Sequence, residues 1–296
     1  MNVRIESMLE NAQATRTRLH FIATVLKSGD GGGQVLDYGC GTGEHLTRYL
    51  GELFPQYEVT GVDPDQESIR FARETFIGIE NLSFATHLPP GKQFDCIIAS
   101  EVLEHVENPF EILMQLRSRL KKDAHLILTV PNGYGPSEWM SFIEAILTLS
   151  GCMRGVRRLK GRLVGKRGNE GRKTPDTLAV SPHINFFEFN KLRRIYNLCG
   201  LEQVRYRGRM LLYDLISSRV FNRFESLAVL NARMAGCLPP FMVSDWMIVL
   251  RKGPAVPLAG KIPVYRRNHF ERLRRHINIR RWRDTESTGG VVACVE

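Results

Sequence analysis

Apolar residues follow two alternating patterns along the first half of the chain: short continuous runs, and longer segments with an apolar residue every three or four positions. Continuous runs are typical of strands buried on both faces, and the longer period is typical of helices. The predicted strands are residues 34–38, 58–62, 82–85, 94–99 and 125–130. The predicted helices are residues 4–27, 44–50, 65–75 and 109–120. Strands that alternate with helices indicate an α/β fold with a parallel sheet and right-handed crossovers.

The second half of the chain continues this alternation with less regular spacing. Helices are predicted at 137–149, 189–199 and 214–235, and strands at 201–209 and 243–250. Prolines and arginines after Gly253 indicate an appendage, in which we expect residues 285–296 to be disordered. We therefore expect one domain over residues 1–253, with an N-terminal helix at 4–28 and insertions at 137–182 and 211–242, followed by a basic appendage at 254–296.

The most informative segment is 35–43, where an apolar pair is followed by Asp37 and then by glycines at positions 39, 41 and 43. Glycines at this density let a strand turn sharply and let the backbone approach a ligand closely. The spacing differs from the dinucleotide fingerprint, and Asp37 would repel a pyrophosphate. The carboxylate instead favours a positively charged nucleoside, and S-adenosylmethionine, with its ammonium and sulfonium groups, fits best. A tight turn without function and a nicotinamide site are the alternatives.

The overall composition places only loose limits on the function. The charge, however, is unevenly distributed along the chain. The chain of 296 residues is 43% hydrophobic and 24% charged, which is typical of a globular protein. Its six cysteines form no Cys-x-x-Cys motif, which argues against a disulfide framework and a zinc site. No apolar run approaches the ~20 residues of a membrane span, and we expect a cytoplasmic protein. Of the net charge of +10, segment 151–173 carries +8 and segment 265–283 carries +7, so the remainder is acidic.

The order of motifs resembles the class I S-adenosylmethionine-dependent methyltransferases, in particular the small-molecule branch that includes the ubiquinone-biosynthesis O-methyltransferases. The motifs that carry the resemblance lie within residues 28–251 and cover 36–43, 61–63, 94–95, 101–106, 130–132 and 183–187. The resemblance implies a Rossmann-like, seven-stranded, mostly parallel sheet of order 3-2-1-4-5-7-6, with an antiparallel last strand and helices on both faces.

The resemblance also implies which residues hold the cofactor. Asp37 and the glycine loop would hold the methionine end, and Asp63 would bind the ribose hydroxyls, a role that suits a carboxylate at the end of a strand. Family members usually place an acidic residue near the adenine amine, whereas this chain has Thr86 and His87 there. The candidate cofactor-binding residues are Asp37, Gly39, Cys40, Gly41, Thr42, Gly43, Asp63, Pro64, Thr86, His87, Ser100 and Glu101.

A second constellation follows the fourth predicted strand and consists of Glu101, Glu104 and His105, with His183 further along the chain. If the first three residues begin a helix, they share one face. Three interpretations stay open. In the first, His105 is a general base that a glutamate orients. In the second, all four residues bind a divalent cation that lowers the pKa of a substrate hydroxyl. In the third, a hydrogen-bonded pair of these residues braces the loop over the cofactor. The metal interpretation, which we do not favour over the others, resembles small-RNA 2′-O-methyltransferases and ubiquinone O-methyltransferases.

These observations predict a methyltransferase that acts on a hydroxyl of a small, hydrophobic or lipid-linked molecule. An RNA 2′-O-methyltransferase with a divalent metal site and a non-catalytic S-adenosylmethionine-binding subunit are the alternatives. The apolar stripe and basic residues of 139–167, together with 265–283, suit an anionic membrane surface at the inner membrane face. The alternative is that the apolar stripes pack against each other and the basic loop is solvated. Nucleic acid ranks lower as a partner, because 151–173 has no aromatic residue for base stacking.

Overall fold

The structure is a computed structural model that describes residues 12–27, 31–150, 182–211, 225–254 and 262–286. Its strands are β1 (Gly33–Tyr38), β2 (Tyr57–Val62), β3 (Leu82–Ala85), β4 (Phe94–Ser100), β5 (Leu120–Pro131), β6 (Leu201–Gly208) and β7 (Asp245–Lys252). Its helices are α1 (Ala12–Leu26), α2 (Thr47–Leu53), α3 (Gln66–Thr75), α4 (Pro109–Arg119), α5 (Pro136–Leu149), α7 (Phe189–Leu198), α9 (Glu225–Ala235) and α10 (His269–Glu286). Residues Pro240–Met242 form a short 3₁₀ helix.

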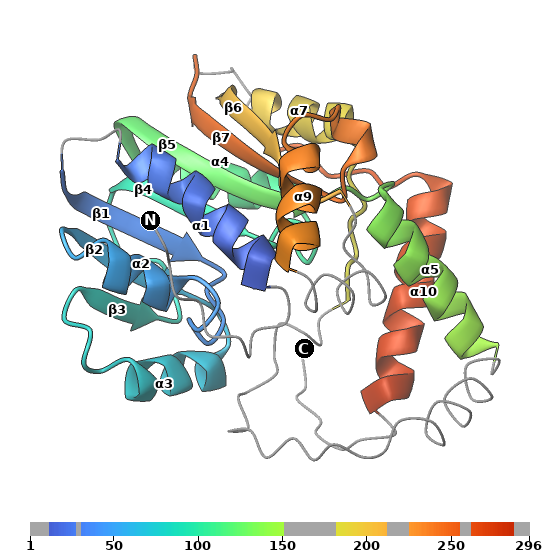
Figure 1. Cartoon of the computed structure of the whole chain (residues 1–296), viewed down its shortest axis with the longest axis horizontal. Helices are drawn as coiled ribbons and strands as arrows, with labels where there is room; N and C mark the ends of the chain where they lie inside the picture. Colours follow the sequence, from blue (N-terminus) through green and yellow to red (C-terminus); the bar gives the residue numbers. More distant parts are fainter. Residues whose placement is uncertain (1–11, 28–30, 151–181, 212–224, 255–261, 287–296) are drawn as a thin grey trace.

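The described strands form one sheet in the order β3-β2-β1-β4-β5-β7-β6 (Figure 1). Neighbouring strands from β3 to β5 are parallel, and β7 runs antiparallel to both β5 and β6. The predicted Rossmann-like fold, its strand order and its antiparallel last strand are confirmed. The order reverses between β1 and β4, and the carboxyl ends of these two strands therefore border the crevice in which open α/β sheets bind ligands.

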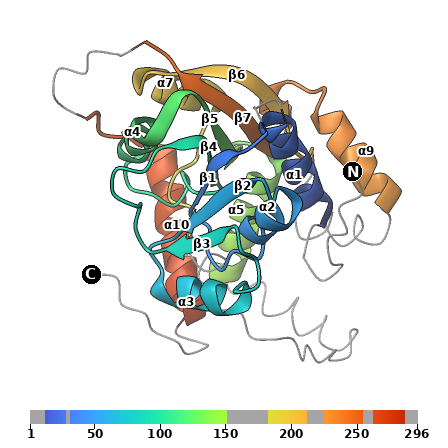
Figure 2. The same cartoon turned by 90° about the vertical axis from the view of Figure 1, so that its left-hand side faces the viewer.

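The sheet is buried on both faces because the middle positions of its central strands are apolar in succession. On one face, Val35 and Ile98 pack with α1 and α2, whereas on the other face Leu36 and Ile97 pack with α4 and α7. Figure 2 shows these two pairs of helices on opposite sides of the strands. The continuous apolar runs of the sequence therefore indicate a three-layer core, in which helices cover both faces of the parallel sheet.

The bounds of α2 and the start of β5 differ from those predicted. Helix α2 spans Thr47–Leu53 rather than residues 44–50, and Leu46, which precedes it, has a non-helical φ of −142°. Strand β5 begins at Leu120, opposite Phe94, rather than at residue 125. Its first residues, 121–123, are polar and gave no apolar signal.

Several predicted segments lie wholly or partly outside the described residues. They are the start of the N-terminal helix, the basic segment 151–173 and residues 214–224 of the predicted helix 214–235. The second basic segment is described, and most of it is α10, which lies beside α5 (Figure 1). The segment that we expected as an appendage therefore contacts the domain directly, and the boundary at residue 253 stays a prediction.

Salt bridges and buried residues hold α10 in place. The carboxylate of Glu271 is 1% exposed and accepts hydrogen bonds from Lys191 of α7 at 2.7 and 2.8 Å. Arg274 is also 1% exposed and lies between α5 and the core. Within the described residues, no helix combines the length and the apolar character that crossing a bilayer requires.

Candidate active site

The glycine loop after β1 has a backbone that requires glycine at three places. Gly39, Gly41 and Gly43 have φ angles of 76°, 54° and 74°, in the left-handed region that side chains disfavour. A Cβ on Gly39 would also lie 2.5 Å from the side chain of Val102. The amides of Gly39 and Cys40 donate to the carbonyl oxygen of Val62 at 2.7 and 3.1 Å, which ties the loop to the end of β2.

Two buried carboxylates flank this loop at the ends of β1 and β2. Asp37 is 2% exposed and accepts a hydrogen bond from the Thr47 hydroxyl at 2.7 Å. Burial raises the pKa of Asp37 to about 6, although the Thr47 hydrogen bond and the Arg18 charge oppose the rise. A buried carboxylate whose pKa is raised is under-compensated by positive charge. The arrangement therefore fits a ligand that brings a cation.

Asp63 closes the loop from the other side. Its two oxygens accept the amides of Gly41 and Asp65 at 2.9 and 3.0 Å, and burial raises its pKa. Each carboxylate oxygen has two acceptor positions, so one position on each oxygen stays available for a vicinal diol. The structure places Asp37 and Asp63 on neighbouring strands, as the sequence predicted.

Arg18 of α1 reaches the same crevice, and sequence reasoning missed it. Its guanidinium donates to the Ser100 hydroxyl at 2.6 Å. Its charge opposes the rise in the pKa of Asp37 and helps to lower the pKa of Glu101. The signal in the sequence is its position: Arg18 lies four residues after Ala14 and four before Ile22, on the buried face of the helix. A buried arginine beside the crevice is suited to a carboxylate ligand group.

Glu101 turns away from the histidines. It has a φ of 57°, so residues 101–105 cannot begin a helix, and the predicted shared helical face is wrong. Its carboxylate accepts the Thr129 hydroxyl at 2.8 Å and lies 3.3 Å from the guanidinium of Arg209. Burial raises the pKa of Glu101, but Arg209 and Arg18 outweigh burial and leave that pKa below its ordinary value. Glu101 is thus an ionised anchor at the end of β4.

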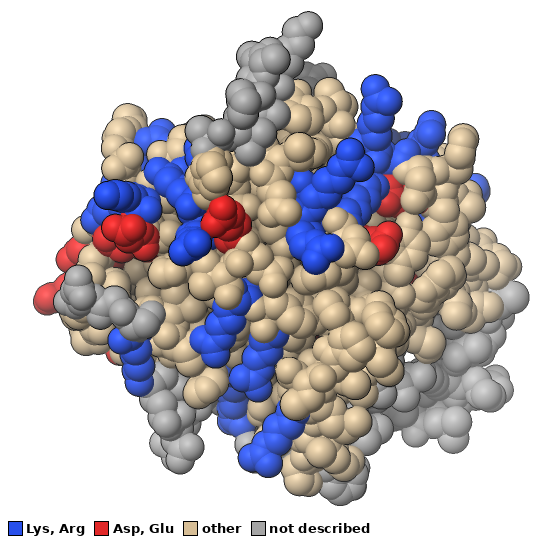
Figure 3. All heavy atoms as spheres, turned by 90° about the horizontal axis from the view of Figure 1, so that it is seen from above, with Lys and Arg blue, Asp and Glu red and all other residues tan. Residues whose placement is uncertain are grey.

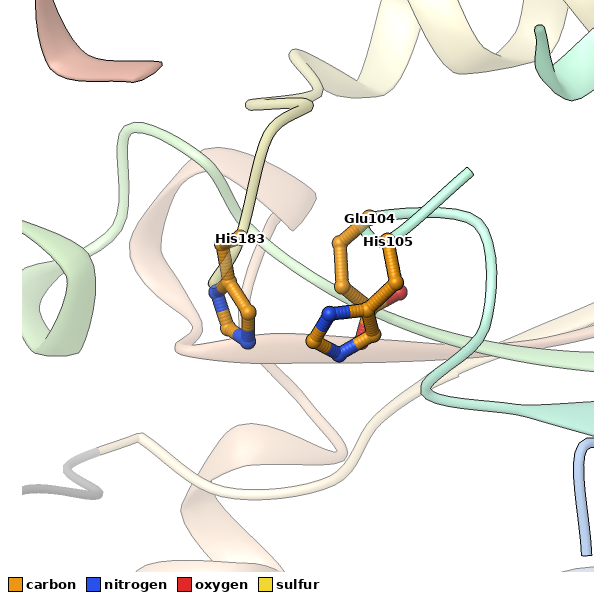
Figure 4. A group of neighbouring side chains, drawn as sticks. All are labelled: Glu104, His105 and His183. Carbon is orange, nitrogen blue, oxygen red and sulfur yellow. The ribbon is translucent and has the colours of Figure 1, made fainter. Parts of the chain in front are cut away.

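Glu104, His105 and His183 come together, as the constellation predicted. Each offers a nitrogen or oxygen atom within 4.8 Å of the other two. The histidine rings approach from two separate loops, and the Glu104 carboxylate lies behind the His105 ring (Figure 4). The ring centroids are 5.0 Å apart, and His105 Nε2 is 3.9 Å from Glu104 Oε1. Glu101 does not belong to this group.

Electrostatics shift the pKa values of the three groups in different directions. Glu104 is fully buried, and neither of its carboxylate oxygens accepts a hydrogen bond from another described residue. Burial, and then the charge of Glu101, raises its pKa well above the ordinary value. Burial and the His183 charge lower the pKa of His105 to about 4. Burial also lowers the pKa of His183, but Glu138, at 2.7 Å, outweighs it and raises that pKa to about 9.

Asn185 joins the two loops that carry the histidines, and sequence reasoning did not assign it a role. Its side-chain amide donates to the carbonyl oxygens of Leu103 and Val106 at 2.8 and 2.6 Å. The amides of Ile184 and Asn185 both donate to the Glu104 carbonyl oxygen, at 2.8 and 3.0 Å. These bonds fix His183 against the Glu104–His105 turn.

Thr86 and His87 follow β3 directly. The Thr86 hydroxyl and His87 Nδ1 are 2.9 Å apart. Thr86 also lines an open hollow of about 380 Å³ with residues of α3, among them Ile69 and Arg73. Their contact with the adenine, like the roles of Pro64 and Thr42, stays a prediction.

Comparison with known proteins decides the family. Residues 9–206 match a family model described as a methyltransferase domain. The chain belongs to the class I S-adenosylmethionine-dependent methyltransferases. The fold of this methyltransferase is similar to the crystal structure of the [4+2]-cyclase SpnF, with a TM-score of 0.52 and 16% identity over 85% of this chain and 86% of that one.

Curated relatives of this methyltransferase act on different substrates. It is 36% identical to the tRNA U34 carboxymethyltransferase of Alteromonas mediterranea, over 33% of this chain and 32% of the relative. It is 32% identical to the malonyl-[acyl-carrier protein] O-methyltransferase of Halalkalibacterium halodurans, over 34% of this chain and 39% of the relative. It is 32% identical to the ubiquinone biosynthesis O-methyltransferase of Bradyrhizobium diazoefficiens, over 43% of this chain and 50% of the relative. The chain therefore spans between a third and a half of the length of these relatives.

Proposed function

We propose that this methyltransferase transfers the methyl group of S-adenosylmethionine to a hydroxyl of a small, hydrophobic or lipid-linked molecule. The observation that supports this most is the presence, in one crevice, of two buried acids around the glycine loop and an imidazole that stays neutral. The acids favour the binding of a cationic nucleoside, and the neutral imidazole can accept the proton of a hydroxyl group. When bound, the cofactor supplies an electrophilic methyl group on a sulfonium.

Each residue of the crevice has a role in this proposal. Asp37 binds the ammonium group, Arg18 the carboxylate of the methionine end, and Asp63 the ribose hydroxyls. The amides of the glycine loop line the same end. Further contacts come from Ser100 and Glu101 at the end of β4, and from Cys40 and Thr42 in the loop.

His105 acts as the general base. Because its pKa of about 4 keeps the ring neutral at neutral pH, it can accept the proton of an acceptor hydroxyl. Glu104 lies directly behind the ring, 3.9 Å from His105 Nε2, and the imidazolium that forms favours ionisation of its carboxyl. His183, held as a cation by Glu138, opposes the rise in the pKa of Glu104 that burial causes.

The test is the release of S-adenosylhomocysteine in the presence of phenolic, sugar and lipid-linked acceptors, with and without EDTA. We expect turnover with a hydroxyl acceptor that is apolar or lipid-linked. Substitution His105→Gln should lower kcat by about 100-fold and leave the affinity for S-adenosylhomocysteine unchanged, since it removes a base and no cofactor contact. Turnover of wild type only with amine or carbon acceptors would contradict the proposed hydroxyl specificity.

A nucleic-acid acceptor is the second candidate, and two observations favour it. Glu104, His105 and His183 form the two-histidine, one-carboxylate donor set that suits a divalent transition metal. Lys and Arg side chains also lie in several groups across the face seen from above, with fewer acidic groups among them (Figure 3). RNA is therefore added to the acceptor panel, and methylation of RNA that EDTA abolishes would reverse our ranking. Binding of the cofactor without turnover of any acceptor would favour the non-catalytic subunit.

A further inference from the structure

We propose that helix α10 completes the active site, with Arg274 acting through Glu138 as a positioning residue for His183. The inference rests on the proposed function only in assigning His183 to the site. It extends that function to the far end of the chain, because Arg274 lies in the basic segment that the sequence indicates as an appendage. Neither Arg274 nor Glu138 belongs to a motif of the sequence.

The contacts form a continuous chain of charged groups. Arg274 Nη2 donates to Glu138 Oε2 at 2.8 Å, and the other oxygen of the same carboxylate, Oε1, lies 2.7 Å from His183 Nδ1. Glu138 is 7% exposed and Arg274 is 1% exposed, so both groups are shielded from water. Each carboxylate oxygen of Glu138 thus serves one of the two partners.

The position of Arg274 is itself fixed from several sides. Its guanidinium lies over the ring of Phe186, 3.9 Å from the centroid, and donates to the carbonyl oxygen of Gly133. Phe186 belongs to the same short segment as His183, and Gly133 lies in the turn before α5, which carries Glu138. Arg274 therefore fixes the distance between the histidine loop and α5 as well as the orientation of the carboxylate.

Other residues of the C-terminal segment hold the backbone of the histidine loop. The side-chain amide of Asn278 donates to the His183 carbonyl oxygen at 3.2 Å. Arg267 donates to the carbonyl oxygen of Ile184 at 3.2 Å and to Asn185 Oδ1 at 3.0 Å. The backbone of His183 is thus held directly, and its ring through Glu138, by residues that follow the sheet in sequence.

The consequence for the site is a fixed orientation of the His183 ring. Because Nδ1 faces Glu138, Nε2 is the nitrogen left to face Glu104 and His105. A hydrogen bond to one ring nitrogen sets the role of the other, and such supporting contacts decide whether a site is held closely enough to act. Loss of Arg274 would let Glu138 and then the His183 ring rotate.

The test compares Arg274→Met, Arg274→Lys and Glu138→Gln with Arg272→Ala as the matched control. Arg272 is exposed on the same helix, so its loss removes a charge and leaves the packing intact. We expect Arg274→Met and Glu138→Gln to lower kcat at least about tenfold with S-adenosylhomocysteine affinity within about twofold of wild type. Arg274→Lys should recover part of the rate, because it keeps the charge without the planar fork. Equal kcat for Arg274→Met and the control would overturn the proposal, as would a parallel loss of cofactor affinity.

A readout that needs no turnover separates this inference from the proposed function. The imidazole nitrogen chemical shifts of His183, assigned with His183→Gln, report the contact at Nδ1 directly. We expect them to move in Arg274→Met and Glu138→Gln and to stay in place in Arg272→Ala. Glu138→Gln is nearly isosteric and keeps α10 packed if Arg274→Met unfolds. Unchanged shifts in Glu138→Gln would refute the positioning role, whereas changed shifts in an enzyme inactive on every acceptor would refute the proposed function alone.

Discussion

At the residue scale, the candidate site is marked by acids whose burial is not fully compensated. Asp37 and Glu104 are both buried, and burial raises the pKa of each. Such groups lower the stability of a fold and are retained where a ligand or a reaction needs them. Glu101 adds strained backbone, with a φ of 57°, at the same edge of the sheet.

The first prediction concerns Asp37 and pH. Its pKa of about 6 means that it is ionised at neutral pH and becomes protonated as the pH falls through 6. Since the ammonium group of the ligand needs the carboxylate, the affinity for S-adenosylhomocysteine should fall about tenfold per pH unit below that value. Isothermal titration calorimetry across this range measures the dependence. Asp37→Asn should bind weakly at every pH, and a variant with wild-type affinity would contradict the role of Asp37.

The second prediction concerns Glu104 and stability. Its pKa in the folded protein lies well above the ordinary value of 4.5, so the folded state holds its proton more tightly than the unfolded state does. The contribution of Glu104 to stability is therefore highest below that ordinary value and declines as the pH rises toward the raised pKa. Glu104→Gln should remove this decline and raise the free energy of unfolding at neutral pH, as measured by urea denaturation. A less stable variant would show that a partner satisfies the carboxylate.

At the scale of elements, the apolar pattern predicted the boundaries that burial sets and missed the boundaries that backbone dihedral angles set. Strand β4 was predicted within two residues because most of its positions are buried, and α4 because its buried positions recur at helical spacing. The start of α2 was missed because Leu46, which precedes the helix, has a non-helical φ of −142°. The helical face proposed for Glu101, Glu104 and His105 was wrong for the same kind of reason, since spacing in a sequence does not reveal a left-handed residue.

The third prediction concerns the start of α10. Asn268 caps this helix: the Glu271 amide donates to Asn268 Oδ1 at 2.8 Å, and the Asn268 amide donates to Glu271 Oε2 at 2.9 Å. This reciprocal pair is a capping box, and Asn268→Ala should cost about 1 kcal/mol. Hydrogen exchange should be faster in α10 and unchanged in α3, which has its own cap at Asp65. If α10 exchanges at the same rate in Asn268→Ala as in wild type, the assignment of Asn268 as its cap is contradicted.

At the scale of the whole molecule, one helix connects the candidate site to an exposed apolar face. Glu138 of α5 faces His183, while other residues of α5 are exposed. The exposed apolar residues of this helix are Trp139, Met140, Ile143, Ile146 and Leu147, between 39% and 47% exposed. An apolar stripe next to the arginines of α10 suits the surface of an anionic bilayer, from which a lipid-linked acceptor would reach the crevice.

The fourth prediction follows from this arrangement. The protein should sediment with phosphatidylglycerol vesicles, and added salt should weaken the association. Replacing Ile143, Ile146 and Leu147 by Gln should reduce binding by at least about tenfold, because each side chain inserts apolar surface. The matched control replaces Leu227, Leu230 and Met234 of α9, which are 41%, 52% and 45% exposed. An equal loss in both triple variants would show that α5 is not the docking face.

The sequence located most of the candidate site because the side chains of this site lie at the ends of strands. Asp37 and Asp63 were found in this way, and His105 and His183 through their motifs. Arg18, Glu138 and Arg274 were missed, since each comes from a helix and reaches the crevice only through the packing of that helix. Contacts between distant helices are a property of the whole molecule and leave no local pattern.

The central claim is that the glycine loop, between Asp37 and Asp63, forms the cofactor site. Its most direct test is a crystal structure of the protein soaked with S-adenosylhomocysteine. We expect the ammonium group of the ligand at Asp37, its ribose hydroxyls at Asp63 and its sulfur facing His105. Ligand bound elsewhere, or a loop that is closed to it by side chains, would contradict the account.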